Sequence, residues 1–120
     1  MRDATRFDLD ARTMRVTFTA WLGPLRVEGH FGELRGSLVL PDTDIERATL
    51  EVDVVAASID TGMTMRDRHL RGASFLDVHH HPLITFSSRR VTRDNGDLLV
   101  AGALTLCGQV REMVTRCAVQ

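Results

Sequence analysis

Three consecutive histidines, His79–His81, are the densest group of potential metal ligands in the sequence. Imidazole nitrogens bind zinc and copper, and three-histidine sites are known. Successive side chains of an extended segment point to opposite sides, so only His79 and His81 converge, and a further ligand must come from His69, Asp77 or another chain. The alternative is a polar loop that leads into a strand. Without spaced ligands, the sequence predicts neither a metal site nor a cofactor, and the pair stays a secondary hypothesis.

The hydroxyl and thiol side chains lack the neighbours that would activate a nucleophile. No serine stands in a Gly-x-Ser-x-Gly motif. Cys107 is far from His69 in the sequence, and no third group to orient the histidine is evident. We therefore predict no catalytic residue and expect that the chain is not an enzyme. The serines considered are Ser58, Ser74, Ser87 and Ser88.

The two cysteines, Cys107 and Cys117, do not by number make a disulfide framework. If the segments around them form a hairpin, Cys107 lies opposite about residue 112, so a cross-strand disulfide with Cys117 is not expected. We expect both to be small, half-buried residues.

The composition is that of one ordinary globular domain over residues 1–120, with 43% hydrophobic and 26% charged residues. The formal net charge of −1 and the scattered basic residues exclude an electrostatic case for binding nucleic acid or an anionic membrane surface. No stretch approaches the roughly 20 apolar residues that span a bilayer. The polar N-terminus, MRDATRFDLDARTMR, contains no apolar segment of a secretory signal. The expected location is the cytoplasm, or the periplasm or exterior if a leader was removed.

Most of the chain alternates between apolar and polar residues, which is typical of strands. In one run, Leu50, Val52 and Val54 face one way while Glu51 and Asp53 face the other. Asp94–Asp97 contains Asn-Gly, a strong hairpin turn, and Gly108-Gln109 is a weaker one. About six long strands joined by short turns predict an antiparallel meander. The other runs are Met14–Trp21, Leu25–Leu40, Leu83–Val91, Leu98–Cys107 and Val110–Val119.

The segment Asp60–Gly72 breaks this pattern because it has no alternation and carries good helix formers. It predicts a short helical insertion near residues 61–72, capped by Thr61 or Thr64 and ended by Gly72.

Closing an antiparallel sheet into a barrel removes its exposed edges, and glycines inside long strands suit tight curvature. Periodicity therefore predicts an all-β sandwich or barrel. The inward-facing set either lines a cavity or fills a solid core, since both need the same residues. Its members are Val16, Phe18, Leu50, Val52, Val54, Ile84, Phe86, Leu104 and Leu106.

The segment Ala57–Phe86, ASIDTGMTMRDRHLRGASFLDVHHHPLITF, resembles the signature of the bacterial YceI-like family of polyisoprenoid-binding proteins. The flanks agree as well, with Val27-x-Gly29-x-Phe31 upstream and Gly102-x-Leu104-Thr105-Leu106-x-Gly108 downstream. The matching residues of the signature are Ser58, Ile59, Thr61, Gly62, Arg66, Asp67, His69, Leu70, Phe75, Asp77, Val78, Pro82, Ile84 and Phe86.

The resemblance implies a lipocalin-like antiparallel β-barrel around an apolar tunnel that carries a polyisoprenoid or other lipid chain. It also implies a role for the signature residues Arg66, Asp67, His69, Leu70 and Phe75. They lie either at the tunnel mouth, facing a ligand's polar head, or hold the helix on the barrel, which we favour because isoprenoid tails lack hydrogen-bond acceptors.

The family's barrel has eight strands, whereas this sequence ends after the sixth predicted strand. Three outcomes are open: a barrel closed by fewer strands, two chains that complete one another, or a short member with a compromised pocket. Because an exposed edge invites pairing, we expect a homodimer. The leading function is non-enzymatic lipid binding. The alternatives are a dimeric structural or interaction protein with a filled barrel and a metal-binding stress protein that uses His79–His81.

Overall fold

The structure is a computed structural model that describes residues 4–42 and 44–118. Strands dominate it, and the only α-helix of the described residues is short. The elements are β1 (Ala4–Asp10), β2 (Val16–Leu22), β3 (Leu25–Phe31), β4 (Leu34–Pro41), the 3-10 helix η1 (Ile45–Arg47), β5 (Thr49–Val55), the 3-10 helix η2 (Ala56–Ser58), β6 (Ile59–Asp60), α1 (Thr64–Leu70), β7 (Leu83–Asp94), β8 (Asp97–Leu106) and β9 (Gln109–Cys117).

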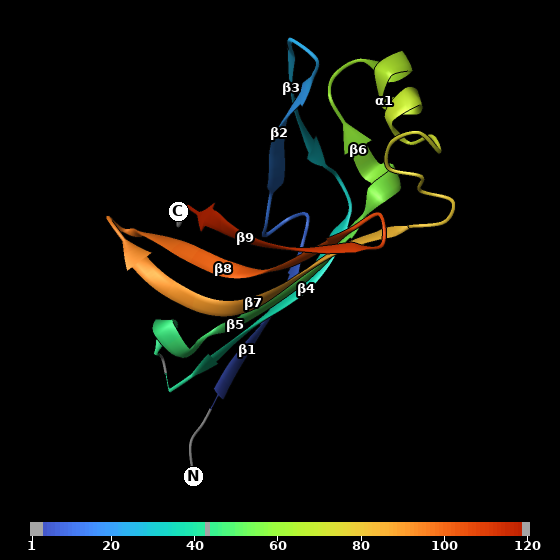
Figure 1. Cartoon of the computed structure of the whole chain (residues 1–120). Helices are drawn as coiled ribbons and strands as arrows, with labels where there is room; N and C mark the ends of the chain where they lie inside the picture. The colour runs from blue at the N-terminus through green and yellow to red at the C-terminus, as the bar shows by residue number, and fades with distance from the viewer. Residues whose placement is uncertain (1–3, 43, 119–120) are drawn as a thin grey trace.

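The strands form two antiparallel sheets (Figure 1). A six-stranded sheet has the order β1-β4-β5-β7-β8-β9, and a three-stranded sheet has the order β2-β3-β6. The β2–β3 hairpin stands up from the curved larger sheet (Figure 1). The predicted all-β, lipocalin-like architecture is confirmed, with sheets that do not close into a barrel within the described residues.

The alternation in β5 is as predicted: Leu50, Val52 and Val54 are buried, while Glu51 and Asp53 are exposed. β-branched residues suit such a pleated surface with one buried face. These side chains lie at the centre of the apolar core.

The predicted run Leu25–Leu40 is two strands in different sheets, and the single-strand interpretation was wrong. The strand pairing is interrupted at Gly32 and Glu33. Ser58, at the end of η2, forms hydrogen bonds with both of these residues. The Ser58 hydroxyl accepts a bond from the Glu33 backbone N–H (3.0 Å) and donates to the Val55 carbonyl (2.6 Å). The backbone N–H of Gly32 donates to the Ser58 carbonyl at 3.0 Å. β1, which pairs with β4, was not predicted at all.

The hairpin turns contain the positive φ angles that Asn and Gly accept readily. Asn95 (φ 50°) and Gly96 (φ 86°) form the predicted turn between β7 and β8. The next turn lies one residue earlier than predicted, at Cys107 (φ 51°) and Gly108 (φ 75°). Cys107 is therefore in a turn and not opposite residue 112. Cys117 pairs with Leu98, and both cysteines are free thiols.

The helix α1 lies inside the predicted insertion, but its N-terminal cap is Met63, without a side-chain hydrogen bond. Neither predicted cap residue takes this position: Thr61 lies two residues earlier, where its hydroxyl donates to the Asp67 carboxylate at 2.5 Å, and Thr64 is the first residue of the helix. After Leu70 the helix ends at Arg71, and the backbone N–H of Gly72 donates to the His69 carbonyl at 3.0 Å. No helix of the described residues has the length and apolar character needed to cross a membrane.

Two aromatic rings lie over glycines of neighbouring strands. The Phe18 ring covers Gly29, its direct partner across β2 and β3, and the Phe86 ring of β7 covers Gly102 of β8. A methyl group at Gly102 would lie 2.8 Å from the Phe86 ring and would overlap the Ser87 carbonyl oxygen. Glycine therefore allows the close approach of these strands and keeps the ring inside.

We predict that Gly102→Ala destabilises the protein by about 1–3 kcal/mol, because backbone atoms cannot move aside cheaply. The midpoint of urea unfolding measures this. The control is Gly32→Ala, where the nearest heavy atom would lie 3.9 Å away, in ordinary contact. Equal stability of the two variants would contradict the packing argument.

Candidate ligand-binding site

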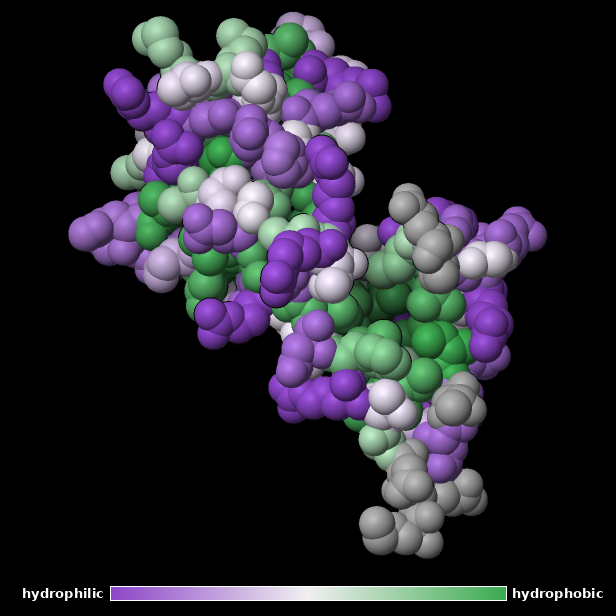
Figure 2. Space-filling model, turned by 180° about the vertical axis from the view of Figure 1, so that it is seen from behind, coloured by the Kyte–Doolittle hydropathy of each residue, from purple (hydrophilic) through white to green (hydrophobic). Residues whose placement is uncertain are grey.

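The concave face of the six-stranded sheet carries a continuous apolar cluster. Its centre is built from alternate residues of β4, β5, β7 and β8, and half-buried side chains of β1 and β9 pack against it. In the space-filling view, apolar side chains lie open in a hollow on the lower half of the molecule, between hydrophilic ones (Figure 2). The fully buried members are Leu34, Ala48, Leu50, Val52, Val54, Ala56, Ile84, Val91 and Val100.

One pocket of about 150 Å³ opens at the end of this cluster near η1. Every strand of the large sheet contributes to it, together with η1 and the turn after β1. Of its lining residues, Thr13 alone carries a hydroxyl and Cys117 a thiol, and the others are apolar. The lining residues are Leu9, Thr13, Met14, Leu38, Ile45, Ala48, Leu50, Val91, Leu98, Val100 and Cys117.

The nine predicted inward residues are not all at one site. Leu50 is the one that lines this pocket, while Val52, Val54 and Ile84 fill the buried core behind it. Val16, Phe86 and Leu104 are half-buried against the same core. Phe18 lines a different groove, and Leu106 is 38% exposed near the turn after β8.

Sequence reasoning missed most of the pocket lining. Leu98 and Val100 share the face of Leu104 by simple alternation, so the same period could have identified them. Met14 and Ile45 lie in a turn and a 3-10 helix, where no period applies.

Cys117 places a thiol beside the apolar pocket. Burial raises the pKa of this thiol, because apolar surroundings disfavour the charged thiolate. The other free thiol, Cys107, donates to the carbonyls of Phe75 and Leu76 at 3.4 Å each. Cys107 thereby ties the β8–β9 turn to the loop that follows α1.

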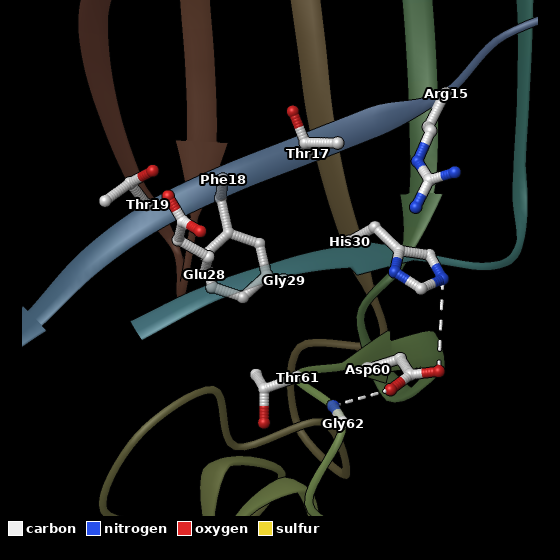
Figure 3. A pocket seen from close by; sticks show the side chains of 10 residues that line it. All are labelled: Arg15, Thr17, Phe18, Thr19, Glu28, Gly29, His30, Asp60, Thr61 and Gly62. Atoms are coloured by element: carbon white, nitrogen blue, oxygen red, sulfur yellow. Dashed lines mark hydrogen bonds and ion pairs between the residues drawn. The ribbon is translucent and has the colours of Figure 1, made fainter. Parts of the chain in front are cut away.

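A larger groove of about 510 Å³ lies between the β2–β3 hairpin and the start of the insertion (Figure 3). It is open, and seven of its ten lining residues have polar or charged side chains. His30 approaches Asp60 at 3.9 Å, and the other Asp60 oxygen accepts the Gly62 backbone N–H at 2.9 Å. Arg15, immediately before β2, points toward His30 (Figure 3). Phe18 is the main apolar surface in this groove, so it suits polar groups better than a long apolar chain.

The charged signature residues form hydrogen bonds with Thr61. Asp67 is buried, and one of its oxygens accepts from the Thr61 backbone N–H (3.0 Å) and hydroxyl (2.5 Å). Arg66 donates to the Thr61 hydroxyl and carbonyl, at 2.9 Å each. The buried Leu70 and a ring contact of 5.1 Å between His69 and Phe75 complete this unit. These bonds connect α1 to the end of β6.

The three histidines do not gather around one point. His80, rather than His79 or His81, binds Asp77, with its Nδ1 3.0 Å from both carboxylate oxygens. This bond lowers the pKa of Asp77. His81 lies against Gly108. Within residues 4–42 and 44–118, no group of three His, Cys, Asp or Glu side chains is placed to hold a metal ion.

Comparison with known proteins places this geometry in a family. The YceI-like domain family matches residues 7–120. The chain belongs to the YceI-like family. A UPF0312 protein of Pectobacterium atrosepticum is 33% identical over 104 residues, which cover 86% of this chain and 54% of that protein. Protein YceI of Escherichia coli O6:H1 is 34% identical over 87 residues, covering 72% of this chain and 46% of YceI. The chain thus spans about half the length of the curated relatives it matches.

Solved structures show the same fold. BcnA of Burkholderia cenocepacia superposes with a TM-score of 0.77 at 20% identity, covering 92% of this chain and 70% of BcnA. The YceI protein of Campylobacter jejuni superposes with a TM-score of 0.68 at 26% identity, covering 81% of this chain and 57% of that one. The predicted membership of the YceI-like family is confirmed.

We predict that Asp67→Ala lowers the free energy of unfolding by about 1–3 kcal/mol, because it leaves the Thr61 donors without their acceptor. Chemical denaturation followed by circular dichroism measures the loss. Arg68→Ala, on the exposed side of the same helix, is the matched control and is expected to change stability little. If Asp67→Ala were as stable as the wild type, the Thr61 bonds would not hold the helix.

Proposed function

We propose that this YceI-like protein binds a long apolar ligand, a polyisoprenoid or another lipid chain, along its apolar inner face, and catalyses no reaction on it. The observation that carries the proposal is the pocket of about 150 Å³, whose lining is almost wholly apolar and which opens from the exposed concave face. Membership of the YceI-like family supports the same ligand class. The cytoplasmic location expected from the N-terminus stays a prediction.

The pocket volume sets how much of a ligand enters. A cavity of about 150 Å³ lined by Leu, Ile and Phe stays dry and holds a molecule of the size of benzene. This pocket is therefore suited to one end of a chain, about one five-carbon unit, and the remainder lies along the open inner face. At about 0.8 kcal/mol per buried methylene, one such unit contributes about 4 kcal/mol before the cost of association.

The chemistry of the lining limits what the pocket distinguishes. Thr13 and Cys117 are its only groups with a polar hydrogen. Selection against an incorrect polar group comes from unpaired donors and acceptors, whereas an apolar wall discriminates weakly between similar chains. We therefore expect similar affinities for prenyl and fatty acyl chains of equal width.

A substitution that fills the pocket tests this proposal. Ala48 is buried in its wall, so Ala48→Leu occupies the space that the chain end needs. We expect the wild type to bind a fluorescent prenyl or fatty acyl probe and Ala48→Leu to bind it at least about tenfold more weakly, since several buried methylenes are displaced. Displacement titration measures affinity, and native mass spectrometry detects co-purified lipid.

The control is Ala101→Leu, on the opposite face of β8 from Val100, which is expected to leave probe affinity unchanged. Bound probe should also slow alkylation of Cys117 in a Cys107→Ser background. Absence of prenyl and acyl binding by the wild type, or unchanged binding by Ala48→Leu, would refute the proposal.

The unpaired sheet edges favour a second proposal, self-association as a structural or interaction protein. β1 and β9 are the outermost strands of the large sheet, and each pairs on one side alone within the described residues. Val110 and Val114 are exposed on β9. An unpaired edge with apolar side chains is a template for another strand. We propose a homodimer joined through β9.

Sedimentation velocity across a range of protein concentrations tests the dimer. We expect a dimer for the wild type and a monomer for Val110→Lys/Val114→Lys, because lysines on an edge strand oppose pairing. Thr92→Lys is the control for added charge, because Thr92 is exposed but lies on β7, an inner strand of the sheet. A wild type that stays monomeric at every concentration excludes this proposal.

A further inference from the structure

Four large apolar side chains remain exposed at one end of the molecule. Trp21 is 65% exposed and Leu25 51% exposed, next to the turn between β2 and β3. Met63 is 57% exposed and Met65 82% exposed, at the start of α1. We name these four residues the apolar tip. Neither the core nor the pocket near η1 includes any of them.

The two parts of the apolar tip share one end of the fold. The β2–β3 turn and α1 both project at the upper end of the molecule (Figure 1), where apolar side chains reach the surface among hydrophilic ones (Figure 2). The polar groove joins them, since Thr19 and Glu28 of the hairpin line it together with Thr61 and Gly62, which precede Met63. The molecule is elongated, with extents of 52 × 29 × 26 Å.

Both segments of the tip have the same charge pattern. Ala20–Leu25 contains no charged residue and is followed by Arg26, and Thr61–Met65 contains none and is followed by Arg66. Arg26 forms an ion pair with Glu28 at 2.7 Å and Arg66 donates to Thr61. Arg68, three residues after Met65, is exposed and makes no ion pair within the described residues. Arg68 is therefore the arginine placed to meet lipid phosphates when the tip enters the acyl boundary. The net charge of −1 provides no attraction over the whole chain, so this attraction is local.

The hairpin part of the tip is conformationally restricted. Gly23 has the positive φ (61°) of a tight turn, and the ring of Pro24 fixes the next φ angle. A turn that is already ordered loses little conformational entropy when it binds. Tryptophan, which has an apolar body and a polar N–H, favours the boundary between hydrocarbon and water.

We propose that the apolar tip docks on the surface of a lipid bilayer, with its side chains in the interface and Arg68 at the headgroups. Two projecting segments suit a soft surface better than a protein, since a specific protein interface buries about 800 Å² on each partner. Docking goes beyond the proposed ligand binding and does not require an occupied pocket. It would bring the protein to the phase in which sparingly soluble chains reside.

Trp21 is both part of the tip and the only strong intrinsic fluorophore, because the sequence has one tryptophan and no tyrosine. Vesicles of phosphatidylcholine mixed with phosphatidylglycerol should shift its emission to shorter wavelength and carry the protein into the pellet. Lipids brominated near the headgroup should quench it. We expect Leu25→Ser/Met65→Ser to weaken partitioning by about tenfold or more, because two apolar side chains no longer enter the interface. Arg68→Gln should weaken partitioning about fivefold, and only for vesicles that contain the anionic phosphatidylglycerol.

The matched control is Leu83→Ser, whose leucine is 46% exposed, close to the 51% of Leu25, but begins β7 outside the tip. It should partition like the wild type. No emission shift and no pelleting of the wild type, or equal loss in the control, overturns the proposal. A shift that depends on protein concentration without vesicles assigns the tip to a second copy and overturns it as well. Ala48→Leu, which fills the pocket and leaves the tip unchanged, should partition like the wild type, so a failure of docking is distinguished from a failure of pocket binding.

Discussion

The hydroxyl of Ser58 holds together the two places where the chain leaves the six-stranded sheet. It accepts from Glu33 at the break between β3 and β4 and donates to Val55 at the end of β5. Because both strands turn at this point, the β2-β3-β6 sheet diverges from the larger one and the concave face stays open. The apolar pocket and the polar groove therefore lie in separate parts of the molecule. Strand residues of the six-stranded sheet line the pocket, and strand residues of the three-stranded sheet line the groove.

This division gives the molecule two surfaces of different chemistry. The concave face offers an apolar wall with few hydrogen-bonding groups, whereas the hairpin end combines charged residues with exposed apolar ones. The unit formed by Thr61, Arg66 and Asp67 lies at the junction and fixes α1 to β6 with four hydrogen bonds. An ordered junction keeps the projecting segments in a defined position relative to the sheet.

Local patterns in the sequence predicted what depends on local physics. The alternation of Leu50, Val52 and Val54 identified a buried face, because successive side chains of a strand point to opposite faces of the sheet. Asn95-Gly96 identified a turn because few residues accept positive φ. The break at Gly32 was not predictable in this way, since Gly29 and Gly36 lie inside strands that continue. Ser58, whose hydroxyl accepts from the Glu33 N–H at this break, is 25 residues further along the chain.

The apolar character of the pocket could be predicted, but most of the residues that line it could not. Family resemblance and periodicity indicated an apolar interior. The actual wall, however, includes Met14 from a turn and Ile45 from a 3-10 helix. Such residues meet the strands only after the chain has folded back, so no spacing within the sequence shows them. β1 was missed because Phe7 and Leu9 alternate with Arg6, Asp8 and Asp10 over a short stretch that looks simply polar.

The pairing of β1 with β4, across the whole β2–β3 hairpin, sets an order of assembly. The hairpin pairs residues that are close in the sequence, such as Leu22 with Leu25, whereas Ala4 pairs with the distant Pro41. Pairings distant in sequence form slowly, because the loop entropy is lost before the contacts are gained. We therefore expect β1 to join a sheet that β4 and β5 have already begun. As an outermost strand with mostly exposed side chains, it is also expected to be among the first segments to exchange its amide hydrogens with solvent.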